Sequence, residues 1–147
     1  MSRIRQAADV DFDLVTGTPP YLPPGTATPS NRPQCRPCRF EDRGGIEAYC
    51  RAGAASMAAT GRFVTCMAWS QDERTREGAR RAGLAVTQTV QVVPREGKAP
   101  LFAVYVMARP PQEFPLHTSP SRLVVRDRHG VRTDGFRQLR QQMGMPP

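Results

Sequence analysis

Apolar and polar positions alternate along the chain in a way that separates short strands from helices. Residues 11–16 form an apolar run typical of a buried parallel strand. Gly17 and the two prolines that follow it prevent any regular element from continuing. Apolar and small side chains then recur at helical spacing from Ile46, which predicts a helix that ends near Thr60-Gly61. Gly53 lies on the apolar face of that helix, where it would permit close packing against a neighbouring element.

Further elements follow this helix. The helix that begins at Gln71-Asp72 and is closed by Gly83 is so polar that we expect it to lie on the outside of a sheet. The strand at 84–93 carries valines on one face, and the short turn before the strand at 101–108 predicts an antiparallel hairpin. The elements predicted after the first helix are strands at 62–68, 84–93, 101–108 and 122–126, a helix at 72–82, and a closing helix capped by Thr133-Asp134.

The order of strand, loop, helix, strand, helix and hairpin predicts an α/β fold. We expect a mainly parallel sheet, with the C-terminal hairpin adding an antiparallel strand near one edge. After Arg109 the chain becomes a proline-rich connector with one short strand and the closing helix. The predicted division is therefore one unit at residues 1–109 and a second at residues 110–147.

Charge is the main compositional feature of the 147 residues. The formal net charge is +8 and comes almost wholly from arginine, with Lys98 as the one lysine. Arginine binds phosphate through its planar fork, which favours an anionic partner, although the base composition of a genome explains arginine richness equally well. No stretch approaches the ~20 apolar residues of a membrane span, and no signal-peptide pattern opens the chain. We therefore expect no membrane association and a cytoplasmic location.

Two of the four cysteines, Cys35 and Cys38, have the spacing used by zinc sites and redox pairs. A closed zinc site would need two more ligands. Cys50 and Cys66 could supply them only if a helix and a strand both faced the same loop, so we expect no metal site. We interpret Cys50 and Cys66 as small core residues, and the role of Cys35 and Cys38 stays open.

A long segment without regular structure, from Gly17 to about Gly45, separates the first strand from the first helix. Loops of this length are usually functional or disordered. Ligands of open α/β sheets bind at the carboxyl ends of strands, which is where this segment begins. The candidate site residues at this position are therefore Thr18, Pro19, Pro20 and Tyr21. The alternative interpretation of these four residues is a rigid turn with a packed tyrosine and no role in binding.

These four residues, following an Asp-Leu-Val strand, resemble the (Asn/Asp/Ser)-Pro-Pro-Tyr motif of class I S-adenosylmethionine-dependent amino-methyltransferases. Residues 57–64 resemble the helix end, turn and strand that follow the motif in that fold, and the hairpin resembles its last two strands. The likeness is to the small-domain type, which includes tRNA adenine amino-methyltransferases and relatives that modify protein glutamine. It covers about residues 11–109 and implies a partial Rossmann-like methyltransferase sheet.

The resemblance implies methyl transfer from S-adenosylmethionine to an amine nitrogen of a planar substrate, with RNA adenine favoured. Thr18 and the Pro19 carbonyl would accept hydrogen bonds from the amine, and Tyr21 would stack on the substrate. Thr18 departs from the motif, because its hydroxyl has a shorter reach than the side chain of Asn or Asp. Arg95 and Lys98 would meet phosphates, unless they belong to an ordinary solvated turn.

The glycine-rich strand-loop-helix that binds the cofactor in this fold does not precede Asp11. We therefore expect weak binding of S-adenosylmethionine by this chain alone. We also expect the flank of the first strand to be an unpaired edge prone to association. One alternative is a non-catalytic remnant that acts by association with another chain. A second is a basic RNA-binding module, which the scarcity of aromatic residues in the loop disfavours.

Overall fold

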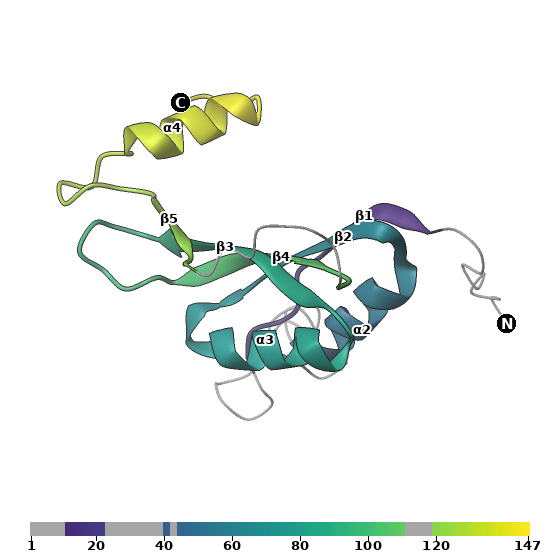
Figure 1. The fold of residues 1–147 in the computed structure, drawn as a ribbon. Coiled ribbons are helices and arrows are strands. Elements are labelled where there is room, and N and C mark those ends of the chain that lie inside the picture. The colour runs from purple at the N-terminus through teal and green to yellow at the C-terminus, as the bar shows by residue number, and fades with distance from the viewer. Residues whose placement is uncertain (1–10, 23–39, 42–43, 111–118) are drawn as a thin grey trace, which may run out of the picture.

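The computed structural model describes residues 11–22, 40–41, 44–110 and 119–147, which form one five-stranded sheet and three α-helices (Figure 1). The strand order is β1-β2-β4-β3-β5. The elements are β1 (Phe12–Gly17), α2 (Ile46–Ser56), β2 (Met57–Ala68), the 3₁₀ helix η1 (Trp69–Gln71), α3 (Asp72–Arg81), β3 (Ala85–Val93), β4 (Phe102–Ala108), β5 (Ser121–Val124) and α4 (Asp134–Gln142).

The sheet is mixed and mainly parallel. β1 pairs in parallel with β2, and β3 pairs in parallel with β5. β4 lies between β2 and β3 and is antiparallel to both of them, so four strands run in one direction and β4 runs in the other. The predicted α/β class, with a mainly parallel sheet and an antiparallel hairpin, is confirmed. The expected position of the antiparallel strand near one edge is wrong, because β4 is the central strand. Because they run in one direction, β1, β2, β3 and β5 all have their carboxyl ends at the same end of the sheet.

Helices α2 and α3 cover one face of the sheet, and the core lies between them and the strands (Figure 1). Helix α3 is the polar helix predicted to lie outside the sheet, and it meets the core through small side chains such as Ala79. None of the helices in the described ranges is long and apolar enough to cross a membrane. The buried core residues are Ile46, Cys50, Ala54, Met57, Phe63, Met67, Ala79, Leu84, Ala103, Tyr105 and Met107.

Helix α2 begins at Ile46 as predicted, but it ends at Ser56, so the predicted end near Thr60-Gly61 is wrong. Met57 already has extended backbone angles and starts β2, and its side chain is 1% exposed. Arg109 donates hydrogen bonds to the carbonyls of Ala54 and Met57. Those are carbonyls that a helix end leaves without an internal partner. Arg109, which directly follows β4, therefore caps the end of the helix, one turn earlier than the sequence predicts.

Gly53 packs as closely as its position on the helix predicted. A Cβ atom at this residue would lie 2.8 Å from the ring carbons of Phe63 on β2. Phe63 is one of the largest fully enclosed side chains in the core. The absence of a side chain at Gly53 therefore lets α2 approach the sheet over that ring.

Strand β1 forms where it was predicted, but it is not the buried strand that its apolar run suggested. Among the described strands it pairs with β2 alone and stands at the edge of the sheet. Phe12 is 47% exposed and Leu14 is 60% exposed. The predicted unpaired flank is confirmed within the described part of the chain, because β1 lacks a second neighbour there.

Strand β3 also differs from its prediction. Its register with β4 shifts between Val86 and Gln88, and beyond that irregularity Thr89, Gln91 and Val93 are the buried positions. The valines that were predicted to form the apolar face, Val86, Val90 and Val92, are only half-buried. Thr89 is satisfied there because its hydroxyl accepts a hydrogen bond from Arg76 of α3, at 3.1 Å. Polar side chains of β3 can therefore face the helices without losing hydrogen bonds.

Candidate functional site

A pocket of about 430 Å³ opens at the end of the sheet where β1 and β2 finish. Its surface is mainly apolar, and it includes one aromatic ring from the loop after β1 and another from the start of β4. This is the position at which open α/β sheets bind ligands, and the volume falls in the range of small-molecule sites. The lining residues are Tyr21, Leu22, Ala68, Ser70, Gln71, Leu101 and Phe102.

Tyr21 is the predicted site residue that lines this pocket. Its ring is half-buried, and its hydroxyl lies 3.1 Å from the sulfur of Cys66 on β2. Burial, together with the contact with Cys66, raises the pKa of Tyr21 above its ordinary value. The tyrosine is therefore neutral at physiological pH and serves as an aromatic wall. Cys66 was predicted to be a core residue, but it is only half-buried and lies outside the core cluster, so that prediction is wrong.

The other three predicted site residues do not line the pocket. Thr18 is exposed, whereas Pro19 and Pro20 are buried. Pro19 is among the residues with less than 2% exposure. The predicted contact between its carbonyl and a ligand is therefore not accessible in this structure.

Backbone pairing places the end of the long loop, at Phe40 and Glu41, next to Leu22 of the pocket wall. Leu22 forms an isolated parallel bridge with Phe40, and the amide of Glu41 donates to the Leu22 carbonyl at 3.0 Å. Phe40 is buried at this junction. Leu22 and Phe40 are thus neighbours in the fold although seventeen residues separate them in the sequence. The second half of the long loop, residues 26–42, is rich in Pro, Ser, Thr and Arg, which predicts a substrate flap, but it lies largely outside the described residues.

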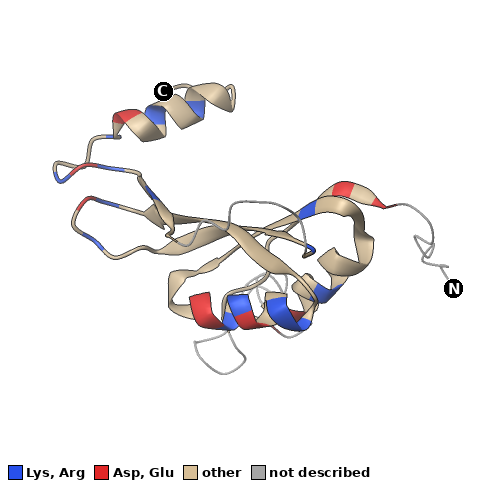
Figure 2. Cartoon of the chain, viewed as in Figure 1, with Lys and Arg blue, Asp and Glu red and all other residues tan. Residues whose placement is uncertain are grey.

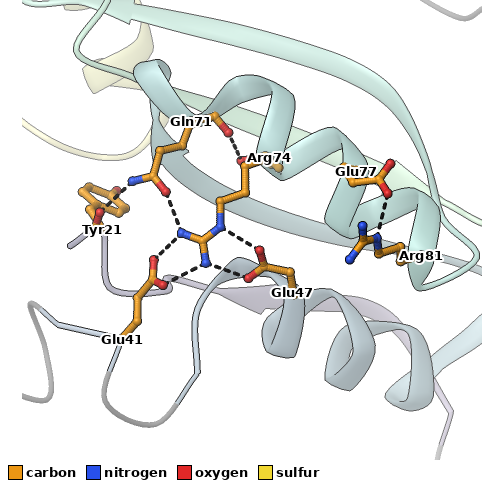
Figure 3. Close-up of polar contacts among 8 residues, drawn as sticks. Tyr21, Glu41, Glu47, Gln71, Arg74, Glu77 and Arg81 are labelled. Atoms are coloured by element: carbon orange, nitrogen blue, oxygen red, sulfur yellow. Dashed lines mark hydrogen bonds and ion pairs between the residues drawn. The ribbon is translucent and has the colours of Figure 1, made fainter. Parts of the chain in front are cut away.

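A charged cluster behind the pocket holds Tyr21 in place (Figure 3). The side-chain amide of Gln71 donates to the Tyr21 carbonyl at 2.7 Å, and its oxygen accepts from Arg74 at 2.8 Å. Arg74 also makes two hydrogen bonds to Glu41 and two to Glu47, at 2.6–2.8 Å. All five N–H donors of the guanidinium are therefore used. The cluster joins the loop end, α2 and the start of α3.

Electrostatics within this cluster favour the charged forms. Hydrogen bonds from Arg74 lower the pKa of Glu47, and hydrogen bonds to Glu41 and Glu47 raise the pKa of Arg74. Gly45 leaves room for the ions, because a Cβ atom there would lie 2.6 Å from the carboxyl carbon of Glu41. Gly44 has a φ of +109°, a conformation that other residues rarely adopt. Gly44-Gly45 thus allows the chain to turn tightly around the cluster.

Gln71, Leu101 and Phe102 contribute to the site and were not identified from the sequence. Gln71 was assigned only as a helix cap, and its side chain makes no cap hydrogen bond. It ends the 3₁₀ turn η1 that follows the carboxyl end of β2, so the rule applied to the loop after β1 would also have selected it. Leu101 and Phe102 open an antiparallel strand. They reach the pocket only because β4 lies next to β2, and no local sequence signal indicates that pairing.

The pocket surface suits the binding of an apolar or aromatic group. None of its lining side chains is acidic or basic, and Ser70 and Gln71 supply the polar side chains. A site of this composition can enclose and orient a planar ring, but its walls hold no general base. The chemistry that it supports is positioning of a substrate.

No group of three or more metal-ligating side chains occurs in the described ranges. Cys35 and Cys38 lie outside the described residues. Cys50 is fully buried, and desolvation raises the pKa of its thiol to about 11. This confirms Cys50 as a core residue, and its thiol stays protonated at physiological pH.

Structural comparison finds methyltransferases at low sequence identity. A predicted O-methyltransferase from Agrobacterium tumefaciens, protein Atu636, matches 84% of this chain with 13% identity and a TM-score of 0.49; the match spans 48% of the length of that protein. The M1.HpyAVI–SAM complex matches 86% of this chain and 60% of its own, with 12% identity and a TM-score of 0.44. Another structure of M1.HpyAVI matches 91% of this chain and 88% of its own, with 11% identity and a TM-score of 0.42. No protein-family model and no curated protein sequence matches the chain.

Proposed function

We propose that the chain carries the substrate-binding side of an S-adenosylmethionine-dependent methyltransferase site. The observation that supports this most directly is the apolar pocket at the carboxyl ends of β1 and β2, with Tyr21 of the Thr18-Pro19-Pro20-Tyr21 loop in its wall. The acceptor that we propose is an amine nitrogen on a planar ring, with RNA adenine favoured. For such a substrate we propose a cytoplasmic location.

In this proposal the chain's own residues hold and orient the ring. Tyr21 and Phe102 enclose it between aromatic walls, and Gln71 keeps the Tyr21 backbone in place. In this proposal the exposed Thr18 hydroxyl accepts a hydrogen bond from the amine, whereas the Pro19 carbonyl, the second acceptor that the motif implies, is buried. Such bonds localise the nitrogen lone pair and make the amine a better nucleophile.

The described residues do not fit the cofactor. Within them no glycine-rich loop links a strand to a helix, and Gly44-Gly45 follows the long loop rather than a strand. The pocket walls also lack a carboxylate for ribose hydroxyls. We therefore assign no cofactor-binding residue and no transfer step to this part of the chain. Calorimetry should find weak or undetectable binding of S-adenosylmethionine by the isolated chain, and micromolar affinity would overturn this part of the proposal.

Binding of adenosine tests whether the pocket holds a planar base, and this test does not require the cofactor. Titration into isotope-labelled protein should shift the amide signals of Tyr21, Gln71 and Phe102 more than those of distant residues. Tyr21→Ala should weaken adenosine binding about tenfold, because stacking on an aromatic side chain contributes roughly 1–3 kcal/mol per base. Tyr21→Phe is the matched control, since it keeps the ring and removes only the hydroxyl bonded to Cys66. Equal binding by the alanine and phenylalanine variants would exclude the stacking role.

A second candidate function is non-catalytic association through β1. The exposed Phe12 and Leu14 beside the unpaired flank of this strand favour it, because edge strands are templates for pairing with another chain. In this alternative the chain is a remnant of the fold that acts by joining another polypeptide. The mass of the protein in solution distinguishes the two candidates.

A further inference from the structure

The positive charge of the described residues is concentrated in one region, which we call the basic surface and define as residues 94–100 and 121–147. Its side chains include eight basic and three acidic residues, whereas the rest of the described chain contains seven of each. The chain outside this region is therefore electrically balanced among the described residues. Figure 2 shows the contrast, since blue and red mix along α3 while blue predominates around the turn after β3 and the C-terminal segment. The basic residues are Arg95, Lys98, Arg122, Arg126, Arg128, Arg132, Arg137 and Arg140.

The two parts of the basic surface are joined by direct bonds. The amide of Glu96 donates to the carbonyl of Arg126 at 2.8 Å, and Arg128 forms an ion pair with Glu96 at 2.9 Å. The guanidinium of Arg95 also lies beside Gly130. The turn between β3 and β4 and the segment after β5 therefore form one continuous surface.

Most of this charge is not neutralised within the protein. Arg126, Arg132 and Arg140 donate to the backbone carbonyls of Gly130, Pro147 and Pro146 rather than to carboxylates. None of the ion pairs formed between described residues includes Arg95, Lys98 or Arg122, and all three side chains are exposed. Fixed guanidinium groups with unused donors are well suited to bidentate binding of phosphate.

The basic surface lies at the same end of the sheet as the pocket. It follows the carboxyl ends of β3 and β5, which are parallel to β1 and β2. The turn at 94–100 leads directly into Leu101 and Phe102, which line the pocket, and the amide of Leu101 bonds to the carbonyl of Val92 at 2.9 Å. A polyanion bound on the surface would therefore run past the pocket entrance.

We propose that the basic surface binds the phosphate backbone of a nucleic acid and presents one of its bases to the Tyr21 pocket. The entry of a base into the pocket rests on the proposed function, whereas phosphate binding stands on the charge distribution alone. The chemistry recognised is the phosphodiester backbone, which RNA and DNA share. The proposal extends the expected phosphate contact from Arg95 and Lys98 to a whole surface formed largely by the residues after β4.

The test measures binding of the full 147-residue chain to fluorescently labelled single strands of RNA and DNA with the same sequence. With about four phosphate contacts, affinity should fall roughly 50-fold between about 50 and 200 mM salt. The double variant Arg95→Gln/Lys98→Gln should bind about tenfold more weakly and reduce the slope of the salt dependence by about 1–2. Tighter binding of either RNA or DNA would identify the source of the backbone.

The matched control is Arg80→Gln/Arg81→Gln, which removes the same charge from the exposed face of α3. It should change affinity less than about twofold, and melting followed by circular dichroism checks that both variants fold. Equal weakening by the two double variants would overturn the proposal, because net charge alone would then explain binding. Binding to phosphatidylserine vesicles without binding to either nucleic acid would also overturn it. Loss of adenosine binding with intact strand binding would refute only the pocket assignment.

Discussion

Arg74 lies at the junction of three segments that are distant in the sequence. Its five donors connect Glu41 at the end of the loop, Glu47 on α2 and Gln71 at the start of α3. Through Gln71 the same residue supports the Tyr21 carbonyl. Arg74 is therefore a positioning residue, because it fixes the wall of the pocket without touching the pocket's occupant in our proposal.

Replacing Arg74 by alanine should lower the free energy of unfolding by about 1–3 kcal/mol, between the values typical of exposed and buried pairs. The reason is that the carboxylate of Glu41, whose side chain is 8% exposed, would lose its partner. Denaturant unfolding at neutral pH measures the loss. Arg81→Ala is the control, because its pair with Glu77 lies on the open surface (Figure 3), where solvent screens the charges, and its loss should change the free energy of unfolding far less.

The pH dependence of the free energy of unfolding provides a second test of the role of Arg74. Hydrogen bonds from Arg74 lower the pKa of Glu47 in the folded protein, so ionised Glu47 stabilises the fold above its ordinary pKa. That contribution is lost as the pH falls toward the lowered value. The difference in stability between the native protein and Arg74→Ala should therefore shrink in acid. A difference that stays constant from neutral to acidic pH would contradict the assignment.

At the scale of single residues, the sequence identified Tyr21 because strand-end position and motif both selected it. It did not identify Arg74, since a helical arginine among six other charged residues reads as a solvated side chain. What makes Arg74 different is the approach of Glu41 and Glu47. That contact depends on the packing of α2 against α3, and not on any spacing within α3.

At the scale of elements, helix α2 shows how packing can override local propensity. Its start at Ile46 was predictable from the apolar spacing and the preceding glycines. Its end was not, because the carbonyls of Ala54 and Met57 are taken by Arg109, more than fifty residues later in the chain. Glycine in a helix interior also costs about 1 kcal/mol relative to alanine, yet Gly53 is kept where Phe63 leaves no space.

Gly53→Ala should therefore destabilise the protein despite its better helix propensity. The added Cβ atom would lie 2.8 Å from the Phe63 ring, and overpacking of this kind costs typically about 1–3 kcal/mol. Gly78→Ala on α3 is the matched control. An added Cβ there would have its nearest neighbours at 3.6 Å, so the variant should be neutral or more stable by up to about 1 kcal/mol. Thermal melting of both variants gives the comparison, and two changes of the same sign would refute the packing argument.

At the scale of the whole molecule, the α/β class and the hairpin followed from the order of strands and helices along the sequence. That order can be recognised from the hydrophobic periodicity without knowing how the strands are arranged in the sheet. The place of β4 between β2 and β3 did not follow, since its sequence is equally compatible with an edge position. The exposure of β1 was mispredicted for a related reason. An apolar run predicts burial only when a neighbour lies on each side, and β1 has a single strand neighbour within the described residues.

The unpaired flank of β1 should make the protein associate at higher concentration. Light scattering should show a mass that rises above the 16.3 kDa of one chain as concentration increases. Leu14→Lys should reduce that rise, because a lysine on an edge strand opposes pairing with another strand. Val131→Lys, at another exposed apolar residue outside the sheet, should leave the rise unchanged. A mass of one chain at all concentrations would exclude association through β1.

The bridge between Leu22 and Phe40 has a consequence for how this protein can diversify. Leu22 and Phe40 are fixed next to each other, so the ends of the chain between them are already close together. Each doubling of a connecting loop adds only about 0.6 kcal/mol of closure entropy. A change in the length of that connection would therefore cost little in closure entropy, while β1, α2 and the Arg74 cluster are held by contacts among described residues.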